Sequence, residues 1–202
     1  MSVKIKVLKL LVVVAILIIG LVANKFKQKP VTLENIEIDT AMTETKSIDE
    51  IWKMKDKNEF VISMYLNIAE KCEYGAAMQN LNDEQRIFYI TQALEMEVNN
   101  GGFSQFFFNS DGCFGDELVS SFEKIGAIKT AEICKNAISV FPDKVPTDWE
   151  TRQVFLTPDD EKEEERMEEI FNECDDAFYE YEDDLLELNY QFIINNKEAF
   201  LK

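Results

Sequence analysis

The sequence contains no histidine, and it has only 4 cysteines among 202 residues. Without histidine, the chain lacks the commonest general base near neutral pH and the commonest metal ligand. The cysteines Cys72, Cys113, Cys134 and Cys174 are too widely spaced to form a CxxC metal or redox pair. Three of them lie among apolar residues at helical spacing, so we expect buried free thiols rather than disulfides.

The sequence also lacks the glycine-rich motifs of nucleotide-binding proteins and the GxSxG motif of hydrolases. The fragment Asn109 to Gly112 is too short for a calcium-binding loop. A hydrolase that uses two carboxylates is conceivable, but with 39 acidic residues any choice of two would be arbitrary. We therefore expect no enzymatic activity, no metal and no cofactor.

Basic residues are scarce outside the N-terminus. The chain has 21 Lys and Arg against 39 Asp and Glu, and six of the lysines lie within residues 1–30, which hold no acid. Residues 31–202 consequently carry 15 basic and 39 acidic side chains, a net charge of −24. Such a field repels nucleic acid and attracts basic proteins, although plain solubility also explains an acidic surface.

One long apolar run is present, between Val7 and Ala23, and lysines flank it on both sides. Its seventeen residues would span roughly 25 Å as a helix, just enough to cross a bilayer. A cleaved signal peptide is the alternative, but the triplet Leu21-Val22-Ala23 is a poor cleavage site. We expect residues 1–23 to be a single-pass membrane anchor and 24–46 a linker. Lysines on both sides leave the orientation undetermined.

Residues 47–202 show the patterns of an all-α domain, because no alternating run is long enough for a strand. Ser47 with Glu50 and Asn82 with Gln85 fit capping boxes at helix starts. An apolar stripe from Ile48 to Cys72 predicts an amphipathic helix that ends near Gly75. A third box, Thr147 with Glu150, predicts a short helix through Phe155.

Glycines predict two further helix ends. The helix that begins at Asn82 should stop at Asn99-Asn100-Gly101-Gly102, because Asn and Gly tolerate the left-handed conformation of a helix end. The aromatic segment Phe103 to Phe108 should then pack into the core. Gly126 should separate one helix that ends at Ile125 from another that ends near Phe141.

The densest acidic segment lies near the C-terminus. Asp159 to Glu187 contains 16 acidic and two basic residues, net −14, and should begin a long helix at Thr157-Pro158. An apolar series from Met167 to Phe192 alternates steps of four and three, which predicts a seam that packs on the domain's own core or in a coiled coil. A helix of about 42 Å would carry roughly one net charge per 3 Å, close to one strand of B-DNA.

This segment supplies the candidate contacts with a basic partner: Asp159, Asp160, Glu164, Glu165, Glu168, Glu169, Asp175, Asp176, Glu180, Asp183, Asp184 and Glu187. The alternative is a solvated helix face, which charge runs usually are. However, like charges at i and i+4 destabilise a helix, and few cations relieve them here.

The stretch from Glu95 to Ser110, with Asn-Gly-Gly-Phe at Asn99 to Phe103, resembles the hallmark of a bacterial family typified by a nineteen-kilodalton DNA-mimic protein. Further matches are Ile125-Gly126-Ala127, Ala137 to Phe141 before Pro142, and Arg152. The resemblance implies an all-helical acidic protein, a homodimer, that occupies the DNA-binding surface of another protein. It also implies that Asn99, Asn100, Gly101, Gly102, Phe103 and Gly126 are structural.

We therefore expect a DNA mimic that binds a basic DNA-binding protein and does not itself bind nucleic acid. Two alternatives remain. The first is a membrane-anchored immunity or accessory protein that neutralises a basic toxin or nuclease. The second is a structural helical module whose charge only keeps it in solution.

Overall fold

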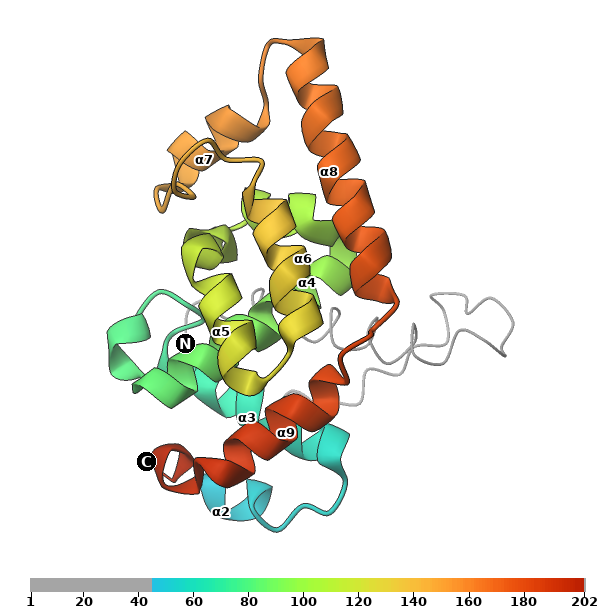
Figure 1. The fold of residues 1–202 in the computed structure, drawn as a ribbon. Helices are drawn as coiled ribbons and strands as arrows, with labels where there is room; N and C mark the ends of the chain where they lie inside the picture. The colour runs from blue at the N-terminus through green and yellow to red at the C-terminus, as the bar shows by residue number, and fades with distance from the viewer. Residues whose placement is uncertain (1–44, 202) are drawn as a thin grey trace, which may run out of the picture. The chain divides into compact units, whose positions relative to one another are not determined.

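A computed structural model describes residues 45–201, and every regular element among them is helical (Figure 1). This confirms the predicted all-α class for that part of the chain. The elements are, in order, α2 Ile48–Ile51, α3 Lys57–Lys71, η3 Met78–Asn80, α4 Asp83–Phe108, η4 Ser110–Glu117, α5 Leu118–Ile125, α6 Ile128–Ile138, α7 Trp149–Leu156, α8 Glu161–Tyr179, α9 Leu185–Asn195 and η5 Lys197–Phe200.

The predicted membrane anchor, residues 1–23, and nearly all of the predicted linker, 24–46, lie outside the described residues. Between residues 45 and 201, no helix is both long and apolar enough to cross a bilayer. Lys46 is held in the folded unit, because its side chain forms an ion pair with Glu59 at 2.7 Å. The carbonyl of Lys46 also accepts a hydrogen bond from Asn67.

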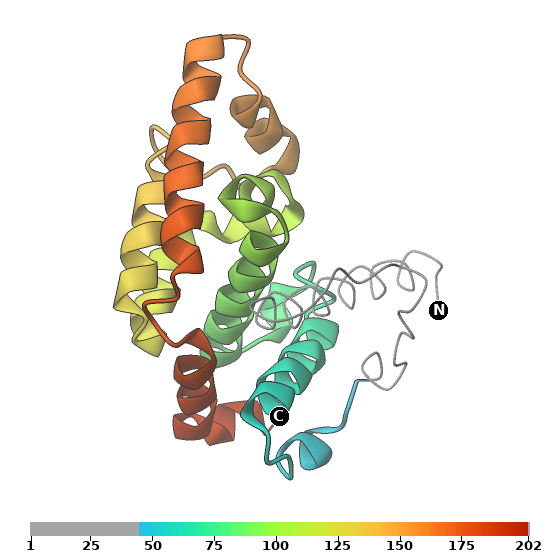
Figure 2. The same cartoon turned by 90° about the vertical axis from the view of Figure 1, so that its right-hand side faces the viewer.

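Helix α4 is the central element, because α3, α5, α7, α8 and α9 all pack on it (Figures 1 and 2). Its N-terminus has the predicted capping box, in which Asn82 accepts a hydrogen bond from the Gln85 amide at 2.9 Å. Its aromatic end is buried as predicted at Phe103, Phe106 and Phe107, which are all fully enclosed, but Phe108 is exposed, contrary to the prediction. Phe107 lies at the middle of this cluster, with ring centroids of Phe141 and Phe171 at 5.2 and 5.6 Å.

The prediction of one helix from Ser47 to Gly75 was wrong. The capping box of Ser47 and Glu50 is confirmed, but α2 ends after four residues at Ile51. Helix α3 begins separately at Lys57, because the Asp56 side chain caps it by accepting from the Glu59 amide at 2.8 Å. A tight turn with left-handed backbone from Glu73 to Gly75 follows α3.

The glycine joint between α5 and α6 is confirmed, since Gly126 ends α5 in the left-handed conformation with φ +88°. The third capping box was misplaced by one residue. Asp148, not Thr147, caps α7 and accepts from the Thr151 amide at 2.8 Å. The four cysteines are free thiols as expected; Cys72, Cys134 and Cys174 are buried, and Cys113 is half-buried.

Candidate partner-binding surface

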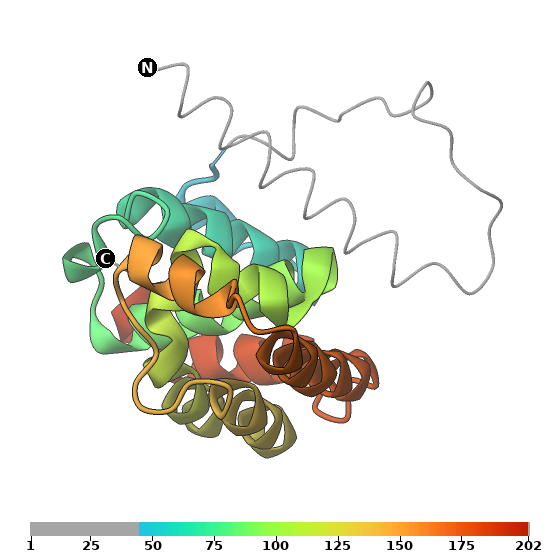
Figure 3. The same ribbon diagram turned by 90° about the horizontal axis from the view of Figure 1, so that it is seen from above.

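Helix α8 lies at the outer side of the folded unit, where it packs against α4 and α6 (Figures 2 and 3). Its inner face consists of Met167, Phe171, Cys174 and Phe178, all buried. Asp160 caps the start of the helix, because its side chain accepts from the Lys162 amide at 2.9 Å. The start predicted at Thr157-Pro158 was therefore three residues early. Acids in the first turn are favoured there by the positive end of the helix dipole.

The outer face of α8 is an exposed ridge of carboxylates, which we call the acidic ridge. Its members are exposed acidic residues on α8 and at its two ends: Asp159, Glu161, Glu164, Glu165, Glu168, Glu169, Glu173, Asp176 and Glu180. Successive members four residues apart, such as Glu161, Glu165 and Glu169, are separated by about 6 Å along the axis. In the described part of the chain, the ion pair of Glu163 with Arg166, at 2.6 Å, neutralises a single carboxylate of this helix.

The charge density of α8 is close to that of a nucleic-acid strand. Glu161 to Tyr179 contain nine acidic and two basic residues, net −7. Nineteen residues rise about 28 Å, which gives roughly one net charge per 4 Å. One strand of B-DNA carries a phosphate about every 3.4 Å. The ridge is thus shorter than the sequence predicted, and its net charge per unit length is somewhat lower. That charge density is still of the same order as in one DNA strand.

The predicted continuous helix from Asp159 to Glu187 is wrong, because α8 ends at Tyr179 and α9 begins at Leu185 (Figure 1). Tyr181 takes a left-handed backbone with φ +48°, which no helix continues through. The next residues are held elsewhere: Asp183 accepts from the Thr130 amide at 2.8 Å at the start of α6. Asp184 caps α9 by accepting from the Glu187 amide at 3.0 Å.

The apolar seam predicted from Met167 to Phe192 is interrupted at the same place. Its first part belongs to α8, and its second part, with Leu185 and Leu188, belongs to α9. Both parts pack on the domain's own core, in which Met167 and Leu185 are 4 % and 2 % exposed. A continuous 26-residue coiled-coil surface, which the sequence allowed, is therefore not formed.

The twelve predicted contact residues divide into two groups. Five have structural partners within the chain: Asp160, Asp175, Asp183, Asp184 and Glu187, the last paired with Lys57 at 2.6 Å. The other seven are exposed on the acidic ridge: Asp159, Glu164, Glu165, Glu168, Glu169, Asp176 and Glu180. Only this second group is available to a partner without breaking a contact of the fold.

The Asn-Gly-Gly-Phe motif connects α4 to α8. Helix α4 is kinked at Gly101 and Gly102, so the predicted helix end is a kink after which six helical residues follow. The amide of Phe103 donates to Asp175 of α8 at 2.7 Å. Gly102 has φ +80°, and a Cβ there would lie 2.2 Å from Asp175 Oδ2. Burial raises the pKa of Asp175, although the amide of Phe103 favours its charged form.

A buried arginine that the resemblance marked, Arg152, fastens α7 to the end of α4. The side chain is fully enclosed and donates to the carbonyls of Phe107, Asn109 and Pro146 at 2.6, 2.6 and 2.7 Å. The carbonyls of Phe107 and Asn109 lie at the end of α4, where the helix itself supplies few donors. The Asn109 carbonyl also accepts from the Gly112 amide at 3.3 Å. The resemblance pointed to this residue, but the sequence pattern alone gave no sign that its partners are carbonyls rather than carboxylates.

Two buried carboxyls went unnoticed in the sequence. Burial raises the pKa of Glu95 to about 7, although hydrogen bonds from Gln92 and Tyr181 oppose the shift. Burial, together with the charge of Glu97, raises the pKa of Asp111 to about 7. For Glu95 the sequence offered one sign of burial, because this carboxyl directly follows Leu94, a residue of the buried apolar stripe.

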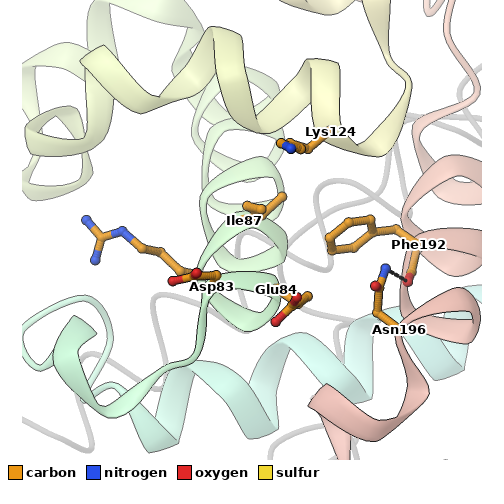
Figure 4. Close-up of a pocket in the computed structure, with 7 residues that line it drawn as sticks. Asp83, Glu84, Ile87, Lys124, Phe192 and Asn196 are labelled. Atoms are coloured by element: carbon orange, nitrogen blue, oxygen red, sulfur yellow. Dashed lines mark hydrogen bonds between the residues drawn. The ribbon is translucent and has the colours of Figure 1, made fainter.

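A shallow pocket of about 490 Å³ lies between the start of α4 and the ends of α5 and α9 (Figure 4). Ile87 and Phe192 form its apolar floor, and Asp83, Glu84 and Lys124 line its rim. It lies away from α8. Within residues 45–201, no group of three or more Cys, Asp or Glu side chains is placed to hold a metal ion.

Comparison with known proteins identifies the family. A family model described as DMP19-like protein matches residues 79–196, which include the kink of α4, Arg152 and all of α8. No curated protein and no solved structure matches the chain. The match covers more than half of the 202 residues and confirms the resemblance drawn from the motif. The chain therefore belongs to the DMP19-like family.

Proposed function

We propose that this protein is a non-catalytic DNA mimic, whose acidic ridge occupies the DNA-binding surface of a basic protein. The observation that carries the proposal is the geometry of α8. Its carboxylates stand in rows on a rigid helix, face solvent, and have a charge density comparable to one DNA strand. Membership of the DMP19-like family supports the same function.

The packing of α8 supports a binding role over a merely solubilising one. A solubilising surface needs net charge but no particular arrangement. Here the like charges lie at i and i+4, which destabilises the helix. Four buried apolar residues and the contact of Asp175 with Phe103 hold α8 in place despite that repulsion. The fold thus maintains a fixed array of negative charge, as a phosphate backbone does.

The test uses two charge-matched variants of the full-length chain. The ridge variant carries Glu164→Gln, Glu165→Gln, Glu168→Gln and Glu169→Gln. The control variant removes four exposed acids elsewhere: Asp49→Asn, Glu123→Gln, Asp143→Asn and Glu198→Gln. Both lose four negative charges, so a difference between them reports position rather than net charge.

Each immobilised protein is incubated with lysate of the host cell, and bound proteins are eluted with duplex DNA at constant ionic strength. We expect a DNA-binding protein to be released from the wild type and the control variant but to be absent from the ridge variant. The purified partner should lose DNA binding when the wild type is added. Equal capture by both variants, or no release by DNA, would refute the proposal.

A further inference from the structure

Two tyrosines at the C-terminal end of the acidic ridge are half-exposed and yet fixed. Tyr179 and Tyr181 are 46 % and 40 % exposed. The Tyr179 hydroxyl donates to the carbonyl of Val98 at 2.8 Å. The Tyr181 hydroxyl accepts from the Asn99 amide group at 2.6 Å and donates to Glu95 at 3.3 Å. Both rings are therefore anchored at their tips to α4, next to the Asn-Gly-Gly-Phe motif.

The buried Phe178 supports both rings from the inner side. Its centroid lies 6.5 Å from that of Tyr179 and 5.5 Å from that of Tyr181, with edge-to-face geometry in each case. An aromatic ring that is held at its tip and at one edge loses little conformational entropy when a ligand stacks on it. The two rings are consequently preorganised surfaces rather than mobile side chains.

Exposed carboxylates surround these rings. Asp176 lies one helical turn before Tyr179, and Glu180 follows it directly. Burial raises the pKa of Tyr179, and the negative charges of Asp175 and Asp176 raise it further, so both carboxylates are near the phenol. Within residues 45–201, the chain's own cations stack on Tyr190, Phe114 and Trp52 instead of on these two rings.

We propose that Tyr179 and Tyr181, together with Asp176 and Glu180, form a site for an arginine side chain of the basic partner. The planar guanidinium stacks on a tyrosine ring while its N–H groups donate to a neighbouring carboxylate. A lysine ammonium satisfies the carboxylate but gains less from the ring, because it is more strongly hydrated and cannot stack as a plane. The inference rests on the proposed function, and it names the chemistry of the partner at one end of the ridge.

The test compares two synthetic peptides of equal length and charge. In one peptide every cationic residue is arginine, and in the other every cationic residue is lysine. Their affinities for the full-length chain are measured by calorimetry at about 50 and 300 mM salt. We expect the arginine peptide to bind about two- to fivefold more tightly, because an exposed cation–π contact contributes about 0.5–1 kcal/mol. This preference should persist at the higher salt concentration, while both affinities fall with screening.

Substituted variants show which residues cause the preference for arginine over lysine. Tyr179→Leu should lower the ratio of the two affinities towards one, whereas Tyr179→Phe, which keeps the ring, should retain most of it. Phe108→Leu is the control, because Phe108 is an exposed ring, 42 % accessible, on a different helix. Circular dichroism confirms that each variant is folded. If Tyr179→Leu does not fold, Tyr181→Leu, which removes the second ring of the site, must lower the same ratio.

The outcomes separate this inference from the proposed function. If both peptides bind the acidic ridge equally and Tyr179→Leu changes neither affinity, the arginine site is refuted while the electrostatic function stands. If neither peptide binds at 50 mM salt, the acidic ridge does not attract basic partners, and both proposals fail. An equal loss of arginine preference in Phe108→Leu would also overturn the assignment to Tyr179.

Discussion

Replacing Gly102 by alanine should destabilise the fold strongly, because two separate costs coincide at this residue. The backbone has φ +80° and ψ 178°, a region that only glycine adopts readily. Placing alanine there costs about 1–3 kcal/mol. The new Cβ would lie 2.2 Å from Asp175 Oδ2 and 2.8 Å from its carboxyl carbon, so the carboxylate must move away.

Moving the carboxylate breaks the hydrogen bond from the Phe103 amide to Asp175, which measures 2.7 Å. A hydrogen bond to a charged group contributes about 1.5–3 kcal/mol. The two costs together predict that Gly102→Ala lowers the free energy of unfolding by about 3–5 kcal/mol. The measurement is urea denaturation of the full-length chain, followed by the helical circular dichroism signal.

Gly101→Ala is the matched control. Gly101 has φ −166°, which lies outside the left-handed region that favours glycine. Its Cβ would meet the end of the flexible Gln105 side chain, which can move. We expect a loss of about 1 kcal/mol or less. A Gly102→Ala variant as stable as Gly101→Ala would refute the reasoning.

A double-mutant cycle apportions the two costs. In an Asp175→Ala background there is no carboxylate to displace, so Gly102→Ala should cost only the backbone strain, about 1–3 kcal/mol. If the cost of Gly102→Ala is the same with and without Asp175, the collision does not occur and only the backbone term is real.

Two further predictions concern buried groups. Arg152→Met should lower the free energy of unfolding by about 3–5 kcal/mol, because it removes the buried side-chain donor shared by the carbonyls of Phe107, Asn109 and Pro146. Arg166→Met, on the exposed face of α8, should cost less than 1 kcal/mol in the same assay. The pH dependence follows from Glu95 and Asp111, whose pKa values in the folded protein are about 7. Both groups hold protons more tightly in the folded than in the unfolded protein, where their ordinary pKa values are 4.5 and 3.8. As far as these groups are concerned, stability should therefore be greatest below about pH 4 and fall as the pH rises through 7. Glu95→Gln should flatten this fall, and a pH profile unchanged by the substitution would contradict the assignment.

Much of the helical architecture was predictable because it depends on residues close together in the chain. The capping boxes at Ser47 and Asn82 and the glycine ending of α5 were read correctly. Each involves side chains and amides within about four residues of one another. The burial of Phe103, Phe106 and Phe107 also followed directly from their apolar character.

The break between α8 and α9 was not predictable in this way. The residues around Tyr181 continue the helical pattern of apolar spacing, so the local sequence favours one long helix. The break depends on Asp183, which bonds to Thr130, 53 residues earlier in the chain. The anchoring of Tyr181 to Asn99 spans 82 residues. Tertiary contacts therefore shortened the acidic ridge.

The sequence by itself determined the fold class, the family and the amount of negative charge, because composition and short-range patterns carry that information. Only the tertiary structure decided which carboxylates remain available. Asp160, Asp175, Asp183, Asp184 and Glu187 bond to partners within the folded chain, while seven neighbours of the same chemical type face solvent. A carboxylate looks the same in a sequence whether its acceptor capacity is used inside the fold or offered to a partner, and only the arrangement of the helices distinguishes the two.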